Sequence, residues 1–151
     1  MPYQQPDFPT RKRPAHRMRS LRLRADRILS PSLRIPHEAE FRYDETDPLV
    51  VSLALRTPEG SVVRWMVSRD VLFEGTEEPS GIGDVRLWPS RVRTCRVVLL
   101  RLEVQQMSSL FEMDLVQLQG WLEETFQLVP PGTEFDHIDW TTALATLMRE
   151  G

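Results

Sequence analysis

WMVSRDVLFEGTEEPSGIGDVRLWPSR, residues 65–91, predicts a strand, a short helix and a second strand in quick succession. The first strand, 62–67, is apolar and rich in β-branched residues. Ser68 is placed to cap the helix, with Asp70 near the positive end of the helix dipole. Gly75 is expected to end the helix by taking the left-handed conformation.

The chain then returns toward the sheet. Pro79 prevents the helix from resuming, and Gly81-Ile82-Gly83 is predicted as a flexible turn. Val85 and Leu87 alternate with charged residues, which predicts a strand with one buried face. The Gly-x-Gly sequence resembles part of a phosphate-binding loop, but no Lys-Ser/Thr follows it and no helix begins there. We therefore interpret it as a tight turn between strands.

Alternation of apolar and polar residues predicts further strands on both sides of this stretch. With the two strands above, they lie at 18–25, 39–43, 49–57, 61–67, 85–88, 96–104 and 110–113. Pro31 and Pro36 are expected to bracket the first turn.

Two helices are predicted after the last strand. Asp114 opens the first with an Asp-x-x-Gln capping box, and Pro130-Pro131-Gly132 ends it. Asp139 is expected to cap the second. The apolar positions of the first helix are Leu115, Leu118, Leu122, Phe126 and Val129, and those of the second are Trp140, Ala143, Leu144, Leu147 and Met148. Seven mostly antiparallel strands followed by two helices predict an α+β fold, with a curved sheet or half-barrel closed by the C-terminal helices.

A length of 151 residues suits one globular domain, 18–151, preceded by a tail, 1–17. The tail is rich in proline and basic residues and has little to bury, so we predict that it is disordered. The charge is uneven. Residues 1–36 carry nine Lys and Arg against two acids, a net +7, whereas residues 37–151 carry ten against twenty, a net −10.

The single cysteine, Cys95, excludes an intramolecular disulfide and is expected to be a buried thiol. No stretch reaches the roughly 20 apolar residues of a membrane span, and the N-terminus lacks the apolar segment of a signal peptide. We therefore expect a soluble cytoplasmic protein.

No catalytic residue, metal ligand or cofactor is predicted. His16, His37 and His137 fall in the tail and in loops, and no nucleophile has a recognisable setting. The run 136–139, Asp-His-Ile-Asp, lacks the ligand spacing of a zinc or EF-hand site, so it is interpreted as a polar helix entry.

A basic cluster at the N-terminus leaves a second class of function open. It could attract single-stranded nucleic acid or an anionic membrane surface. Against nucleic acid, the body is acidic and the two tyrosines of the chain form no row for base stacking. The residues of this alternative are Arg11, Lys12, Arg13, Arg17 and Arg19.

The chain also resembles a known family, the SsgA-like proteins of sporulation and cell division in morphologically complex actinobacteria. Four segments carry the resemblance. They are Phe41-Arg42-Tyr43-Asp44 with Asp47-Pro48, Val63-x-Trp65 leading to Ser68-Arg69-Asp70-x-Leu72-x-Glu74-Gly75, Pro79-x-Gly81-x-Gly83-Asp84-Val85-Arg86-x-Trp88-Pro89-Ser90-Arg91, and Val129-Pro130-Pro131-Gly132-Thr133-Glu134.

This resemblance implies a β-rich fold similar to the Whirly proteins, with C-terminal helices and assembly into homotrimers. It also implies a non-catalytic role at division septa. Family members act in septation and cell-wall remodelling, and the best understood help to place the tubulin-like GTPase FtsZ. The partners to expect are FtsZ, another SsgA-like protein or a wall protein, with peripheral membrane contact as a further possibility. The tail of about seventeen residues departs from the short start typical of the family.

The partner-binding surface is expected on the 69–91 unit, because aromatic and arginine anchors dominate protein interfaces. Its exposed acids and any exposed part of Trp88 are the expected contact chemistry. The candidate residues are Arg69, Asp70, Glu77, Asp84, Trp88 and Arg91. Trp65, Leu72 and most of Trp88 are interpreted as core, and the glycines as turn residues.

Overall fold

The computed structural model describes residues 17–136 together with Ala145, Leu147 and Met148. Within residues 17–136 the chain forms a sheet of eight strands and two helices, and Ala145, Leu147 and Met148 are helical as well. The strands and the two helices are β1 (Met18–Ser30), β2 (Leu33–Asp44), β3 (Val50–Arg56), β4 (Val62–Ser68), α2 (Arg69–Gly75), β5 (Ser80–Ile82), β6 (Val85–Val92), β7 (Cys95–Val104), β8 (Met107–Asp114) and α3 (Leu115–Leu128).

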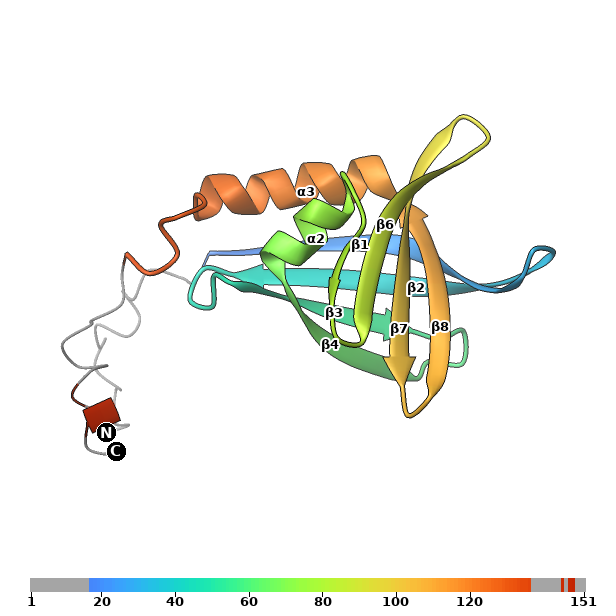
Figure 1. The fold of residues 1–151 in the computed structure, drawn as a ribbon, viewed down its shortest axis with the longest axis horizontal. Helices are drawn as coiled ribbons and strands as arrows, with labels where there is room; N and C mark the ends of the chain where they lie inside the picture. Colours follow the sequence, from blue (N-terminus) through green and yellow to red (C-terminus); the bar gives the residue numbers. More distant parts are fainter. Residues whose placement is uncertain (1–16, 137–144, 146, 149–151) are drawn as a thin grey trace, which may run out of the picture.

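The strands are antiparallel throughout and lie in the order β4-β3-β2-β1-β8-β7-β6-β5. The sheet therefore consists of two four-stranded meanders. β1 and β8 join them through the two pairs Asp26↔Glu112 and Arg27↔Phe111. Figure 1 shows the curled sheet with α2 and α3 together on one side of it. The predicted α+β half-barrel is confirmed.

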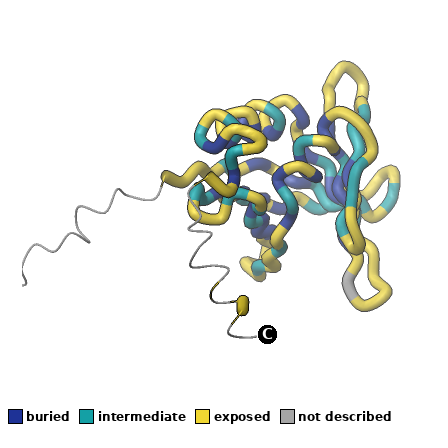
Figure 2. Tube along the Cα trace, turned by 60° about the vertical axis from the view of Figure 1, so that its left-hand side comes forward, coloured by how far each residue is buried: buried dark blue, intermediate teal, exposed yellow. Residues whose placement is uncertain are grey.

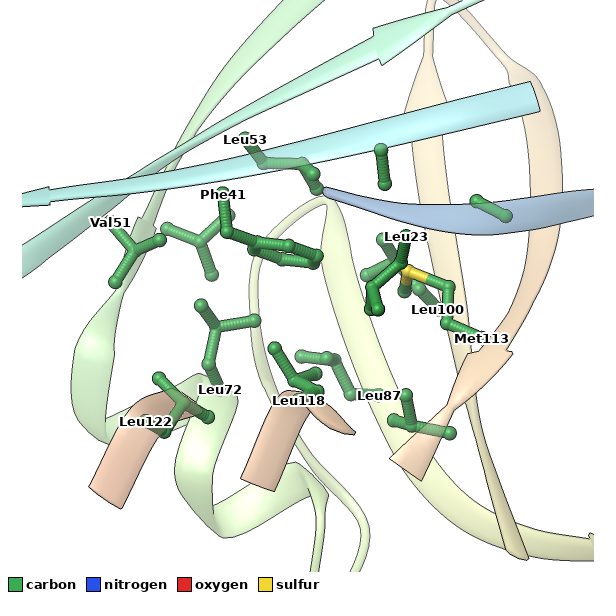
Figure 3. Packing of buried hydrophobic residues seen from close by; sticks show 14 of the residues in the cluster. Leu23, Phe41, Val51, Leu53, Leu72, Leu87, Leu100, Met113, Leu118 and Leu122 are labelled. Carbon is green, nitrogen blue, oxygen red and sulfur yellow. The ribbon is translucent and has the colours of Figure 1, made fainter. Parts of the chain in front are cut away.

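The core lies between the inner face of the sheet and the two helices. Alternate residues of each strand point inward, as the period of two requires. Figure 3 shows Phe41 and Leu53 of the sheet facing Leu72 of α2 and Leu118 and Leu122 of α3, all fully buried. Each such leucine contributes about 1.5–3 kcal/mol of stability. Exposed residues gather at the hairpin tips (Figure 2).

The two helix N-caps are confirmed. Ser68 Oγ accepts a hydrogen bond from the Val71 amide at 3.3 Å, and Asp114 Oδ1 accepts one from the Gln117 amide at 2.9 Å. α3 also buries Trp121, which the predicted apolar positions did not include, with its ring 5.9 Å from that of Phe41. These caps fix where each helix leaves the sheet.

One strand was not predicted. Residues 80–82 form β5, which pairs with β6 from Ser80↔Leu87 to Ile82↔Val85, where the sequence indicated only a flexible turn. The turn itself is Gly83-Asp84, and Gly83 has a φ of 61°, which glycine adopts readily. The sheet thus has eight strands rather than seven.

The first hairpin is longer than predicted. Its turn is Pro31-Ser32, and Pro36 lies inside β2 opposite Asp26. β2 pairs with β3 only from Glu38 onward, so at Pro36 it has β1 as its single sheet neighbour. A proline is tolerated at such an edge position because no strand on the β3 side needs the missing N–H.

Gly75 is needed for close packing rather than for a left-handed turn. It is the last residue of α2, its φ is not positive, and Thr76 continues with a φ of −81°. A Cβ on Gly75 would lie 2.6 Å from the Cβ of Leu87. Glycine therefore lets α2 rest directly on β6, and the prediction of a left-handed cap was wrong.

Two further predictions concern single segments. Cys95 is exposed at the start of β7, so the expectation of a buried thiol was wrong. The second C-terminal helix, predicted from Asp139, falls largely outside the described residues. The same holds for residues 1–16 of the predicted tail.

Candidate partner-binding site

Arg69 is buried rather than on the surface of the molecule. It is the first residue of α2, and its side chain is 1% exposed. The guanidinium lies between two rings, with Cζ 4.2 Å from the centroid of Phe126 and 5.0 Å from that of Tyr43. Such stacking suits the planar, delocalised charge of arginine.

The same guanidinium binds the end of α3. Nη1 donates to the carbonyl oxygens of Thr125 at 3.0 Å and Val129 at 2.8 Å, and Nη2 donates to Glu134 Oε2 at 3.1 Å. The last carbonyls of a helix have no intrahelical donor and form the negative end of its dipole. Arg69 of α2 therefore caps the C-terminus of α3.

Two titratable groups beside Arg69 are shifted. Hydrogen bonds from its own backbone N–H, from the Gly132 amide and from Arg69 hold the pKa of Glu134 below its usual value, although burial opposes them. Burial raises the pKa of Tyr43 to about 12, and its hydroxyl donates to the Pro48 carbonyl at 3.0 Å. Both shifts favour the protonation states that pack here at neutral pH: a carboxylate and a neutral phenol.

Three of the four sequence segments that carry the family resemblance meet at this point. Tyr43 comes from the first, Arg69 from the second, and Val129 and Glu134 from the fourth. A buried side chain cannot contact a partner in this conformation. The prediction of Arg69 as a contact residue is therefore corrected: its surroundings give it a structural role.

Glu77 and Arg91, two other predicted contact residues, line one polar recess of about 450 Å³. The recess lies between the end of α2, the ends of β6 and β7 that form their hairpin, and the start of α3. Gln119 Nε2 donates to Thr76 Oγ1 at 3.2 Å and ties α3 to the end of α2 there.

Arg96 also lines the recess and was not predicted. It pairs directly with Arg91 across the β6–β7 ladder, and both residues are exposed. Within the part of the chain that the structure describes, neither arginine forms an ion pair. Like charges directly opposite each other destabilise a sheet, so this pair is a feature that folding alone does not favour. In the sequence Arg91 lies between the predicted strands 85–88 and 96–104 and Arg96 begins the second, and only the strand register shows that they face each other.

The structure places the other predicted contact residues at separate positions. Asp70 is exposed in the first turn of α2, and Asp84 is exposed in the β5–β6 turn, at the opposite end of β6 from Arg91. Trp88 is partly buried and lies opposite Leu99 of β7. The recess therefore brings together only Glu77 and Arg91 of the predicted set.

The residues of the polyanion alternative are only partly described. Arg11, Lys12 and Arg13 lie outside the described residues. Arg17 and Arg19 are exposed, and Arg17 Nε pairs with Glu45 Oε2 at 3.2 Å. Among the described residues, no cluster of three or more potential metal ligands occurs, and neither helix is long and apolar enough to cross a bilayer.

Comparisons with known proteins agree with this architecture. SsgB of Streptomyces coelicolor, named a sporulation-specific cell division protein, is 37% identical over 123 residues, covering 82% of this chain and 90% of the relative. SsgB of Kineococcus radiotolerans is 34% identical over 149 residues, covering 95% and 85%. The solved SsgA-like sporulation-specific cell division protein of Thermobifida fusca superposes with a TM-score of 0.78 at 27% identity, covering 87% of this chain and 96% of that one.

A second solved structure, from work on SsgB mutations and longitudinal cell division during sporulation of Streptomyces coelicolor, has a TM-score of 0.78 at 36% identity. The superposition covers 82% of this chain and 97% of that one. The family described as "Streptomyces sporulation and cell division protein, SsgA" matches residues 38–134. That range contains all four segments of the sequence resemblance and the whole Arg69 cluster. The chain therefore belongs to the SsgA family of sporulation and cell division proteins.

Proposed function

We propose that this protein acts in sporulation-specific cell division without catalysis, by binding a protein partner at division septa. Family membership supports the division role, since the relatives are named sporulation-specific cell division proteins. We choose the recess as the binding surface because Arg91 and Arg96 face each other there, and neither forms an ion pair among the described residues.

The chemistry of this pair indicates what would bind. Two guanidinium groups side by side offer a fixed fork of donors that fits carboxylates, and an acidic segment of a partner would remove their mutual repulsion. Glu77 on the opposite wall adds an acceptor for a basic or polar group of the same segment. The recess thus fits a segment with at least two acids and one donor.

The partners that we propose are an FtsZ-type division protein or another SsgA-like protein, with the protein acting as a homo-oligomer of three copies. Within residues 37–151 the net charge is −10, so a second SsgA-like chain with a similar body would present acids of its own to the recess. Light scattering of the purified protein tests the trimer, and a monomer would contradict it.

Charge reversal tests the recess. In a sporulating host, a fluorescent fusion carrying Arg91→Glu and Arg96→Glu should lose its septal position. The matched control is Arg56→Glu with Arg64→Glu, since these two arginines are exposed on β3 and β4 and the change in net charge is the same. Thermal unfolding of both purified double variants should match that of the unmodified protein, which separates lost contact from lost fold.

The result divides the hypotheses. Septal position retained by the Arg91/Arg96 variant would reject the recess, whereas loss in both double variants would indicate attraction by overall charge. A deletion of residues 1–17 that alone abolishes the septal position would favour the polyanion alternative over a protein partner.

A further inference from the structure

A second cavity opens at the end of the half-barrel that α2 and α3 do not cover. Its volume is about 360 Å³, within the roughly 300–1,000 Å³ range of small-molecule sites. The β3–β4 and β7–β8 turns lie at this end of the sheet (Figure 1), and Thr57 and Gln105 from these turns line the opening. The cavity is separate from the recess that holds Arg91 and shares none of its lining residues.

The walls are mainly apolar and aromatic. Trp65 of β4, Phe111 of β8 and Leu102 of β7 form them, together with Met107, which is 67% exposed at the rim. A methionine rim adapts to the shape of what it contacts, and two aromatic side chains favour a flat or extended apolar body. The walls alone would favour a neutral hydrophobic ligand.

Arg27 changes that preference, because it brings a positive charge to the same cavity. It lies on β1, opposite Ile35 and Phe111, and its residue is half-buried. Its Nε is buried and has no hydrogen-bond partner, and no acid of the described residues pairs with it. None of the residues that line the cavity is acidic. The terminal nitrogens of this guanidinium are not among the buried atoms without a partner and Arg27 lines the cavity, so an incoming anion can bind there and neutralise a charge that no described acid pairs.

His37 lies beside this charge. It is 9% exposed, and its ring meets that of Phe111 edge-on, with the centroids 5.4 Å apart. Its Nδ1 lies 3.1 Å from the Ile35 carbonyl oxygen, which can only accept, so Nδ1 carries the proton of this bond. That bond fixes the orientation of the imidazole in the cavity wall. His37 therefore shapes the wall, and Arg27 is the residue that would bind the anion.

We propose that this cavity binds a small amphipathic anion: an apolar chain or ring against Trp65 and Phe111, with a carboxylate or phosphate head on Arg27. No part of this site overlaps the proposed partner surface. The proposed binding of an anion therefore does not depend on the proposed role at septa, and each can be tested without the other.

The test uses the full-length protein with decanoate and decyl phosphate, each below its micelle concentration. Decanol and decyltrimethylammonium are the matched uncharged and cationic probes. Binding is followed by calorimetry and by the indole NMR signal of Trp65, assigned through Trp65→Phe. We expect at least one of the two anions to bind and to shift that signal, with decanol and the cation at least tenfold weaker. The tighter of the two anions identifies the head group.

Two variants locate the head group. Arg27→Gln should weaken binding of the anion about tenfold or more, the usual value of a charged hydrogen bond. Arg24→Gln is the control, because Arg24 lies on the same strand but on its outer face, paired with Asp26. Equal binding of decanol and decanoate, no shift of Trp65, or equal loss in both variants would overturn the proposal. If Arg27→Gln does not fold, the comparison of the four probes on the unmodified protein decides alone.

Discussion

Arg69 and Phe126 stack inside the protein, with the guanidinium carbon 4.2 Å from the ring centroid, where α3 ends. The contact joins the first residue of one helix to the last turn of another. Since the same guanidinium also binds the Val129 carbonyl and Glu134, one side chain holds α2, α3 and the segment after α3 together. Four consequences of this region and of the α2 packing can be measured.

Arg69→Ala should destabilise the protein by about 3–5 kcal/mol, because it leaves Glu134 and the Val129 carbonyl without their buried partner. Urea unfolding followed by circular dichroism measures the change. Arg64→Ala, an exposed arginine of β4, should stay within about 0.5 kcal/mol of the unmodified protein. A loss as small for Arg69 as for Arg64 would contradict the capping role.

Stability should depend on pH through Glu134. Its folded-state pKa is lowered, so its carboxylate stabilises the fold above the unfolded value of about 4.3, and this contribution is lost as the pH falls through the folded value. The difference in unfolding free energy between the unmodified protein and Glu134→Gln should therefore be full at pH 7 and shrink in the acid range below about 4. A difference that does not change with pH would refute this assignment.

Tyr43 should ionise late. Its phenol is buried and its pKa is raised to about 12, so absorbance at alkaline pH should show an ionisation step there. The neutral phenol stabilises the fold below the ordinary value of about 10, and this contribution disappears as the pH rises through the folded value. Tyr43→Phe should remove the ionisation step near pH 12. If the step remains in that variant, it belongs to another group.

Gly75→Ala and Gly120→Ala should act in opposite directions. The first puts a Cβ 2.6 Å from Leu87 Cβ and should cost about 1–3 kcal/mol. The second adds a Cβ with no other atom within 4 Å, on the exposed side of α3, and should stabilise by about 0.5–1 kcal/mol. Thermal unfolding of both variants checks the pair. A stabilising effect of Gly75→Ala would mean that helix propensity, not packing on β6, decides at Gly75, and a destabilising effect of Gly120→Ala would contradict the open space at that position.

Local chemistry predicted most of the fold. The alternation at Leu23 and Ala25 identified the inner face of β1, and the capping residues Ser68 and Asp114 located both helix starts. β5 was missed because Gly81 at its centre has weak strand propensity, and only pairing with β6 makes Ser80–Ile82 a strand. Sequence signals therefore predict a helix or strand well where its conformation is determined by residues close in sequence.

The site was harder to predict, because its contacts are distant in sequence. Arg69 binds groups 56, 60 and 65 residues away, and nothing in its neighbours indicates that it is buried. A charged residue in a family motif was therefore assigned to the surface. Arg96 was missed for the related reason that its importance depends on the register with Arg91, which the sequence does not specify.

The strand order has a consequence for how the chain folds. Of the seven strand pairings in the described sheet, only β1 with β8 joins strands that are not consecutive in the chain. Each meander can therefore form through short loop closures, which are fast, and the slow entropic step is the single closure that brings the first strand to the last. Arg69 begins α2, which follows the first meander, and α3 follows the second. The buried arginine can therefore bind the end of α3 only after β1 and β8 have paired.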